Sequence, residues 1–205
     1  MHLTSYDNMR YFVNKYLGDL ENKKLKIIDI GSQDVTDPKI KSLTYRSLFT
    51  NENWKYQGLD IEAGRNVDIV VKNHYSWNEI KSQSYDVVIS GQAFEHTEYF
   101  WITMLEITRI LKQGGLCCIL APSSGHEHRY PVDCWRFFPD GFRALANFSG
   151  LEILESFHCW DREDIPIEEN EWKDTVGIFR KNKQNFIQSF KFGVKNYIQK
   201  KLITL

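Results

Sequence analysis

Two aspartates and a glycine close short apolar runs in the first third of the chain. Asp29 and Gly31 lie in KIIDIGSQD, and Asp60 ends YQGLD. Glycine lets the backbone approach a ligand closely, and a carboxylate can accept an ammonium group or both hydroxyls of a ribose. The spacing therefore indicates a cofactor that contains a nucleoside.

The turn after the first run is acidic and holds one glycine. A dinucleotide site would need G-x-G-x-x-G to seat a pyrophosphate on a helix N-terminus, whereas Gly31 stands alone and Asp34 would repel a diphosphate. S-adenosylmethionine has no phosphate and combines a cationic amino-acid end with a ribose. It is therefore the predicted cofactor.

Histidines follow two later apolar runs. His96, with Glu95 beside it, comes after the run at 84–91, and His128 comes after the run at 116–122. Methyl transfer to an alcohol often needs a base, and imidazole titrates near neutral pH. We predict either His96 or His128 as that base. The alternative is that both cap helices or hold the loop.

Residues 123–150 form a connector rich in His, Arg and aromatic residues. An arginine fork can bind a phosphate or carboxylate, and aromatic rings can stack on a sugar. The alternative for the aromatic residues is simple packing of the loop onto the sheet. The predicted substrate contacts are His126, Arg129, Tyr130, Asp133, Trp135 and Arg136.

The same connector holds residue types that bind zinc or magnesium, namely His126, Glu127, His128, Asp133 and Cys134. However, H-x-H is not H-E-x-x-H, and Cys134 has no C-x-x-C partner. We therefore predict no metal.

Short apolar runs alternate with segments of helical spacing, and together they predict the strands and helices. We expect strands over 26–31, 56–61, 66–71, 84–91, 116–122, 151–158 and 174–181, and helices over 4–18, 37–49 and 98–115. Residues 159–173 leave no room for a crossover helix, so the last strand is expected to be antiparallel. The prediction is an α/β fold: a Rossmann-like seven-stranded, mostly parallel sheet with helices on both faces.

Length and charge limit the protein class. The chain has 205 residues and a formal net charge of -1, which fits one globular domain and gives no support for a nucleic-acid partner. The four cysteines form no C-x-x-C pair, and the N-terminal residues lack the apolar stretch of a signal peptide. We expect a cytoplasmic protein whose domain covers residues 1–180.

Residues 181–205 contain six lysines, no acidic residue and an apolar stripe at helical spacing. They predict a basic amphipathic helix. Such a helix packs on its own domain or on a second copy in a homodimer, or it lies on an anionic membrane or another partner. The stripe consists of Phe186, Phe190, Val194, Tyr197 and Ile198.

The segments KIIDIGSQD, YQGLDIE, SYDVVISGQAFEH, RILKQGGL and PSSGHEHRYPVDCWRFFPDGF together resemble the class I S-adenosylmethionine-dependent methyltransferases, in particular small bacterial members associated with surface-polysaccharide gene clusters. The resemblance implies that Gln33 joins Asp29 and Gly31 at the methionine end and that Asp60 and Ile61 lie at the ribose. It places Ser90, Gly91 and Gln92 at the methionine part and reaction centre. After the third strand the family commonly has an acidic residue, whereas this chain has Lys72-Asn73-His74; Asn73 is the predicted adenine contact because an amide both donates and accepts.

The expected activity is O-methylation of a sugar, nucleotide-sugar or related glycan precursor, or of a phosphate-derived group on it. Oxygen is favoured because SGQAFEH stands where N-methyltransferases of this fold often carry (N/D)PP(Y/F). The alternative is a non-catalytic subunit that keeps the outline of the cofactor pocket and binds a partner.

Overall fold

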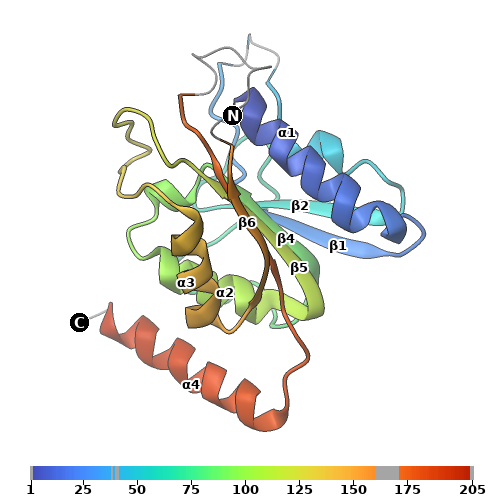
Figure 1. The fold of residues 1–205 in the computed structure, drawn as a ribbon, viewed down its shortest axis with the longest axis vertical. Coiled ribbons are helices and arrows are strands. Elements are labelled where there is room, and N and C mark those ends of the chain that lie inside the picture. The colour runs from blue at the N-terminus through green and yellow to red at the C-terminus, as the bar shows by residue number, and fades with distance from the viewer. Residues whose placement is uncertain (1, 38, 40–41, 160–170, 204–205) are drawn as a thin grey trace.

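The computed structural model describes residues 2–37, 39, 42–159 and 171–203. Its strands form one sheet in the order β3-β2-β1-β4-β5-β7-β6 (Figure 1). The strands are β1 (Leu25–Ile30), β2 (Trp54–Asp60), β3 (Ile69–Val70), β4 (Tyr85–Gly91), β5 (Leu111–Ala121), β6 (Glu152–His158) and β7 (Thr175–Arg180). The α-helices are α1 (Leu3–Phe12), α2 (Phe100–Ile110), α3 (Pro139–Ser149) and α4 (Phe186–Leu202).

The strand directions confirm the predicted mixed sheet. Strands β3, β2, β1, β4 and β5 run parallel, and β7 lies antiparallel between β5 and β6. β1 is flanked by β2 on one side and β4 on the other, so the chain reverses its direction of winding at β1. In an open parallel sheet, ligands bind beyond the carboxyl ends of the strands at such a point.

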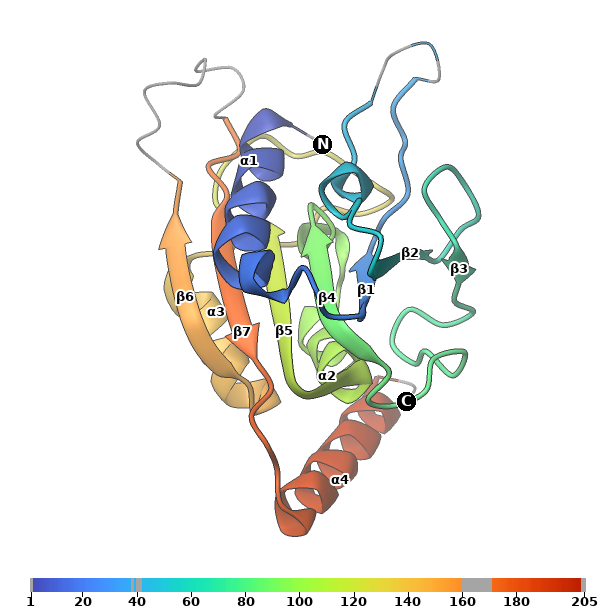
Figure 2. The same ribbon diagram turned by 90° about the vertical axis from the view of Figure 1, so that its right-hand side faces the viewer.

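Helices cover both faces of the sheet, as predicted (Figure 2). On one face, Met9 and Phe12 of α1 pack with Ile27 and Ile89. On the other face, α2 and α3 pack with the alternate strand residues, among them Ile28. The β-branched runs thus fold into strands because their successive side chains point to opposite faces and both faces are covered.

The predicted helix over 37–49 is wrong in the part of that segment that the structure describes. Only a 3-10 turn, Tyr45–Leu48, forms there. The Asp34 carboxylate accepts hydrogen bonds from the Thr36 backbone amide and the Ser42 hydroxyl, so local polar contacts compete with a helix. Two further predicted elements are shorter in the structure. The helix expected over 98–115 is α2, which ends at Ile110, and the strand expected over 66–71 is β3, which has two residues. Residues 160–170, within the predicted 159–173 connection, lie outside the described residues.

The C-terminal helix α4 contacts the domain through its polar side. Asn196, which is 7% exposed, donates to the buried carboxylate of Glu106 on α2, and Lys200 binds the same carboxylate at 2.7 Å. The predicted apolar stripe remains exposed to solvent, with exposures from 43% at Val194 to 83% at Phe186. Packing of the stripe on its own domain, one of the expected outcomes, is therefore not what the structure shows.

Among the described residues, the helices are too short or too polar to span a bilayer.

Candidate functional site

A cavity of about 870 Å³ opens at the carboxyl ends of β1, β2 and β4. It is the place that the strand order selects for a ligand, and both the turn after β1 and the loop after β5 border it. The predicted site residues that line it are Asp29, Gly31, Gln33, Asp60, Ile61, Gly91, Gln92, His96, His128, Arg129 and Tyr130.

The turn after β1 requires glycine. Gly31 has a φ of +74°, and a Cβ atom built on it would lie 2.4 Å from the Cβ of Ala93. A side chain at this position would therefore be strained and would clash with the turn after β4. Gly31 and Ala93, which meet at this close approach, both line the cavity.

Asp29 is a buried acid at the end of β1. It is 3% exposed and accepts a hydrogen bond from the Tyr56 hydroxyl. Burial raises the pKa of Asp29 to about 7; the hydrogen bond from Tyr56 acts against this increase, and the nearby carboxylate of Asp60 adds to it. A positively charged group beside Asp29 would stabilise the ionised carboxylate that burial disfavours.

Asp60, at the end of β2, holds the neighbouring loops. One carboxylate oxygen accepts from the Gln33 backbone amide at 2.9 Å, and the other accepts from the Ile61 amide at 2.7 Å. Each oxygen retains a second lone pair, and the side chain lines the cavity. Asp60 can therefore fix the turn and accept ligand hydroxyls at the same time.

The end of β4 holds a residue in an uncommon backbone conformation. Gln92 has a φ of +61°, and its amide group donates to Asp174 at 3.0 Å. Non-glycine residues in this region of φ cluster at functional sites. By contrast, Ser90 is fully buried, donates to the Ile30 carbonyl and joins β4 to β1 below the cavity, outside its lining.

His96 and His128 meet at the wall of the cavity. Their ring centroids are 4.7 Å apart. Burial, the largest influence, lowers the pKa of His96 below its ordinary value. The His128 ring also contacts Trp172, at 4.4 Å between centroids. The structure thus brings together the two histidines that we predicted from separate segments.

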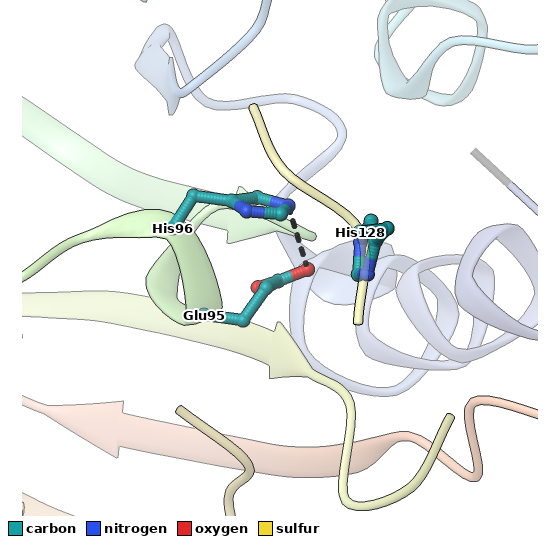
Figure 3. A group of neighbouring side chains, drawn as sticks. All are labelled: Glu95, His96 and His128. Atoms are coloured by element: carbon teal, nitrogen blue, oxygen red, sulfur yellow. Dashed lines mark ion pairs between the residues drawn. The ribbon is translucent and has the colours of Figure 1, made fainter. Parts of the chain in front are cut away.

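Glu95 lies directly beside this pair (Figure 3). Its side chain is fully buried, and its Oε1 is 3.7 Å from Nε2 of His96. Burial and the nearby Asp174 raise the pKa of Glu95 to about 8. Among the described residues, no other residue donates a hydrogen bond to either carboxylate oxygen. Buried polar groups without partners are rare and often functional.

Several predicted substrate residues instead hold the loop together. Arg136 forms two hydrogen bonds to the Asp133 carboxylate, at 2.6 and 2.8 Å, and also binds the His126 carbonyl. The Trp135 ring nitrogen donates to the Glu98 carbonyl, and the His126 ring pairs with Glu171. None of these four residues lines the cavity. Their placement favours a structural role over the predicted substrate contact.

Asn73 is also outside the cavity lining. Its side chain accepts a hydrogen bond from the Tyr75 backbone amide at 2.8 Å and so closes a local turn. His74 and Trp77, on the same loop after β3, line the cavity instead. Asn73, the predicted adenine contact, thus lies outside the lining, whereas other residues of its loop contribute to it.

The sequence analysis missed other residues of the lining, including His2, Tyr45 and Trp172. Tyr45 is 2% exposed, and a Cβ atom on Gly91 would lie 2.0 Å from its hydroxyl oxygen. These residues come from loops and from the N-terminus, where no periodic pattern marks a direction for a side chain. The one available signal was the glycine that ends β4.

Comparison with known proteins agrees with this geometry. Residues 48–119 match the family model described as a methyltransferase domain. The fold is that of the class I S-adenosylmethionine-dependent methyltransferases, and a methyltransferase domain implies S-adenosylmethionine as cofactor. A search of curated proteins finds no match.

Three solved structures illustrate the likeness. A Burkholderia thailandensis 1,6-didemethyltoxoflavin-N1-methyltransferase with bound S-adenosylhomocysteine is 12% identical, with a TM-score of 0.63 over 87% of this chain and 79% of that one. A Haemonchus contortus phosphoethanolamine N-methyltransferase with S-adenosylmethionine is 14% identical, with a TM-score of 0.62 over 86% and 53%. The [4+2]-cyclase SpnF is 12% identical, with a TM-score of 0.62 over 87% and 81%. At these identities the likeness shows the fold, which also serves a cyclase.

Proposed function

We propose that this protein is an S-adenosylmethionine-dependent O-methyltransferase that acts on a sugar, nucleotide-sugar or related glycan precursor. The observation that carries the proposal is the cavity where β1 and β2 end, with buried Asp29 and the Gly31 turn on one side and the His96–His128 pair on the other. It provides separate places for a cofactor and for an acceptor.

The residues around the first turn fit the cofactor. Asp29 offers a buried carboxylate to its ammonium group, the Gly31 turn lets its methionine part approach the backbone, and Asp60 offers carboxylate lone pairs to the ribose hydroxyls. We also assign Gln33, Ile61, Gly91 and Gln92 to this site because they line the cavity. S-adenosylmethionine supplies an electrophilic methyl group when it is bound.

His96 and His128 are the residues that we assign to loss of the proton from the acceptor hydroxyl. Both line the cavity, and the lowered pKa of His96 keeps its imidazole neutral at physiological pH. A neutral imidazole can accept a proton in the transition state, whereas an imidazolium cannot. This availability of a base supports oxygen as the methylated atom.

Arg129 and Tyr130 support a polar, sugar-containing acceptor. Both line the cavity, and both are exposed, with Tyr130 at 60%. Within the described part of the chain, Arg129 pairs with the exposed carboxylate of Glu127, so an incoming phosphate or carboxylate can compete for it. Because Arg136 is engaged with Asp133, the option of a phosphate-derived group depends on Arg129.

Two measurements test the proposal. Calorimetry with S-adenosylhomocysteine should give micromolar binding, and NAD should give none; no heat with either ligand would favour the non-catalytic subunit. Mass analysis after incubation with S-adenosylmethionine and a panel of nucleotide-activated sugars should then show one added methylene mass on one member. Cofactor binding without any methylated product would reject the substrate class while leaving the cofactor site.

We further propose a cytoplasmic protein that contacts an anionic membrane surface through α4. Among the described residues, the four cysteines form no disulfide with one another, which is compatible with a reducing compartment. The exposed stripe of α4 is accompanied by exposed Lys183 and Lys191, and residues 181–205 carry no acidic side chain. Two such helices would repel each other, so their charge favours an acidic lipid surface over a second copy.

A further inference from the structure

A buried carboxylate and two imidazole rings converge at the acceptor side of the cavity (Figure 3). One potential ligand atom from each of Glu95, His96 and His128 lies within 4.8 Å of the other two. Glu95 is 0% exposed, and no other residue in the described part of the chain donates a hydrogen bond to its two oxygens. Burying a carboxylate without a donor is costly, so this position is suited to a cation.

Both histidines are oriented as metal ligands usually are. Nδ1 of His96 lies 2.6 Å from the Val132 carbonyl oxygen, which leaves Nε2 for a ligand, 3.7 Å from Glu95. Nδ1 of His128 lies 3.4 Å from the Asp133 carboxylate, which leaves its Nε2. A carbonyl or carboxylate on the far nitrogen fixes the tautomer and direction of a metal-bound histidine.

The surrounding charges also favour a cation. Asp133 and the fully buried Asp174 lie close enough to act electrostatically on Glu95. Arg136 is a nearby positive group, but Asp133 binds its guanidinium at 2.6 and 2.8 Å and offsets its charge. The balance of these groups around Glu95 is therefore negative.

We propose that Glu95, His96 and His128 bind a divalent transition-metal ion, with Zn²⁺ as the best match. Two imidazole nitrogens and one carboxylate oxygen form a donor set of catalytic zinc sites, which keep one coordination position open. Ligand atoms lie about 2.0–2.2 Å from Zn²⁺, so modest rotations of the rings must bring the donors together. The H-x-H pattern of the loop did not indicate this site because Glu95 and His96 come from another segment.

The site gives the histidine pair a more specific role. Both rings line the cavity, so the open position would face the acceptor. A cation there would lower the pKa of an acceptor hydroxyl bound at the open position. The proton would then pass to solvent water, because both imidazoles would hold the metal and could not serve as the base assigned above. That consequence rests on the proposed function, whereas metal binding itself does not.

The test is metal binding by the full-length, tag-free protein after treatment with a chelator. Calorimetry with Zn²⁺ should show one ion per chain, and Co²⁺ should give visible absorption bands at the same stoichiometry. The Glu95→Gln and His128→Ala variants should each weaken binding by about tenfold or more. His126→Ala is the matched control, because this histidine lies on the same loop and pairs with Glu171 outside the cluster, so it should bind like wild type.

Melting curves and S-adenosylhomocysteine binding by the same preparations show whether each variant is folded. The proposal is overturned if folded wild-type protein binds less than one ion per chain. It is also overturned if the His126→Ala variant loses binding as strongly as His128→Ala, since the ion would then sit on surface histidines. Wild-type protein that binds the cofactor product but no metal would reject this site and leave the proposed methyltransferase.

Discussion

At the residue scale, Asp60 combines a structural contact with the assigned ribose contact. The Asp60→Ala variant should weaken S-adenosylhomocysteine binding roughly 10- to 100-fold, because hydrogen bonds to a charged acceptor are lost. Asp68→Ala is a suitable control: Asp68 also accepts a backbone amide of β2, that of Gly58, but does not line the cavity. It should lower the melting temperature and leave the affinity unchanged. Wild-type affinity of Asp60→Ala would mean that Asp60 only holds the turn.

The pKa of Asp29 predicts a pH dependence of cofactor binding. Because burial raises this pKa to about 7, a growing fraction of the carboxyl is protonated as the pH falls from 7 to 6. Only the carboxylate attracts the ammonium group, so affinity for S-adenosylhomocysteine should decrease by up to about tenfold per pH unit below 7. Calorimetry at pH 6.0, 6.5, 7.0 and 7.5 measures this; a flat profile would contradict the assignment.

The same raised pKa predicts the sign of a stability effect. The unfolded chain ionises Asp29 at about its ordinary pKa of 3.8, whereas the folded chain resists ionisation up to about 7. Ionised Asp29 therefore lowers the stability of the ligand-free protein, fully so above pH 7. The Asp29→Asn variant keeps an acceptor for Tyr56 and should melt at a higher temperature at pH 8, yet bind S-adenosylhomocysteine more weakly. A lower melting temperature at pH 8 would show that the carboxylate stabilises the fold.

At the scale of elements, Glu106 joins α2 to α4 and to the loop before β4. It is fully buried and accepts from the Trp77 amide, from Arg109, and from Asn196 and Lys200 of α4. Burial alone would raise the pKa of Glu106, but the hydrogen bonds from Arg109 and Lys200 outweigh it and hold the pKa at about 2.

Removing this carboxylate should be strongly destabilising. The Glu106→Gln variant leaves two cations without their counter-charge, and the free energy of unfolding should decrease by about 3–5 kcal/mol in urea titrations. Glu152→Gln is the control: Glu152 faces Arg180 at 4.0 Å and both side chains are more than 40% exposed, so its change should stay within about 0.5 kcal/mol. In wild type, the contribution of Glu106 is present above pH 4.5 and decreases as the pH falls towards 2. Equal stabilities of the two variants would contradict this role.

The elements that could be predicted from sequence are those in which local pattern and burial agree. β1 and β4 are β-branched runs covered on both sides, and each ends at a turn where glycine is needed. The predicted 37–49 helix does not form because the carboxylates of Asp34 and Asp37 accept hydrogen bonds from nearby groups, among them the Ser42 hydroxyl, and so compete with helical hydrogen bonds. The sequence pattern identified residues at the strand ends that line the cavity, whereas it did not predict the contacts within the connector. In the connector, Asp133 and Arg136, three residues apart, form an ion pair with each other, which the sequence pattern did not indicate.

At the scale of the whole molecule, the cavity lies at the carboxyl ends of the parallel strands. The helix α4 lies near the opposite ends of these strands (Figure 2). The parallel strands point towards the cavity, and α4 packs against α2 near the opposite ends of these strands. A surface that docks through α4 would therefore leave the cavity entrance accessible. This separation allows membrane contact to be tested independently of cofactor binding.

The protein should sediment with vesicles that contain anionic phosphatidylglycerol and should remain in solution with neutral phosphatidylcholine vesicles. Exposed lysines contribute about 1 kcal/mol each near an acidic surface, and the apolar stripe adds burial. A double Lys183→Glu, Lys191→Glu variant should bind such vesicles less, and added salt should weaken wild-type binding.

Phe186→Ser and Phe190→Ser should also reduce vesicle binding, because these side chains are 83% and 64% exposed and contribute apolar surface rather than fold stability. All three variants should keep wild-type affinity for S-adenosylhomocysteine, since none of the substituted residues lines the cavity. If wild-type protein instead elutes as a dimer, ignores anionic vesicles and becomes monomeric on Phe190→Ser, then a second copy covers the stripe despite the repulsion between lysines.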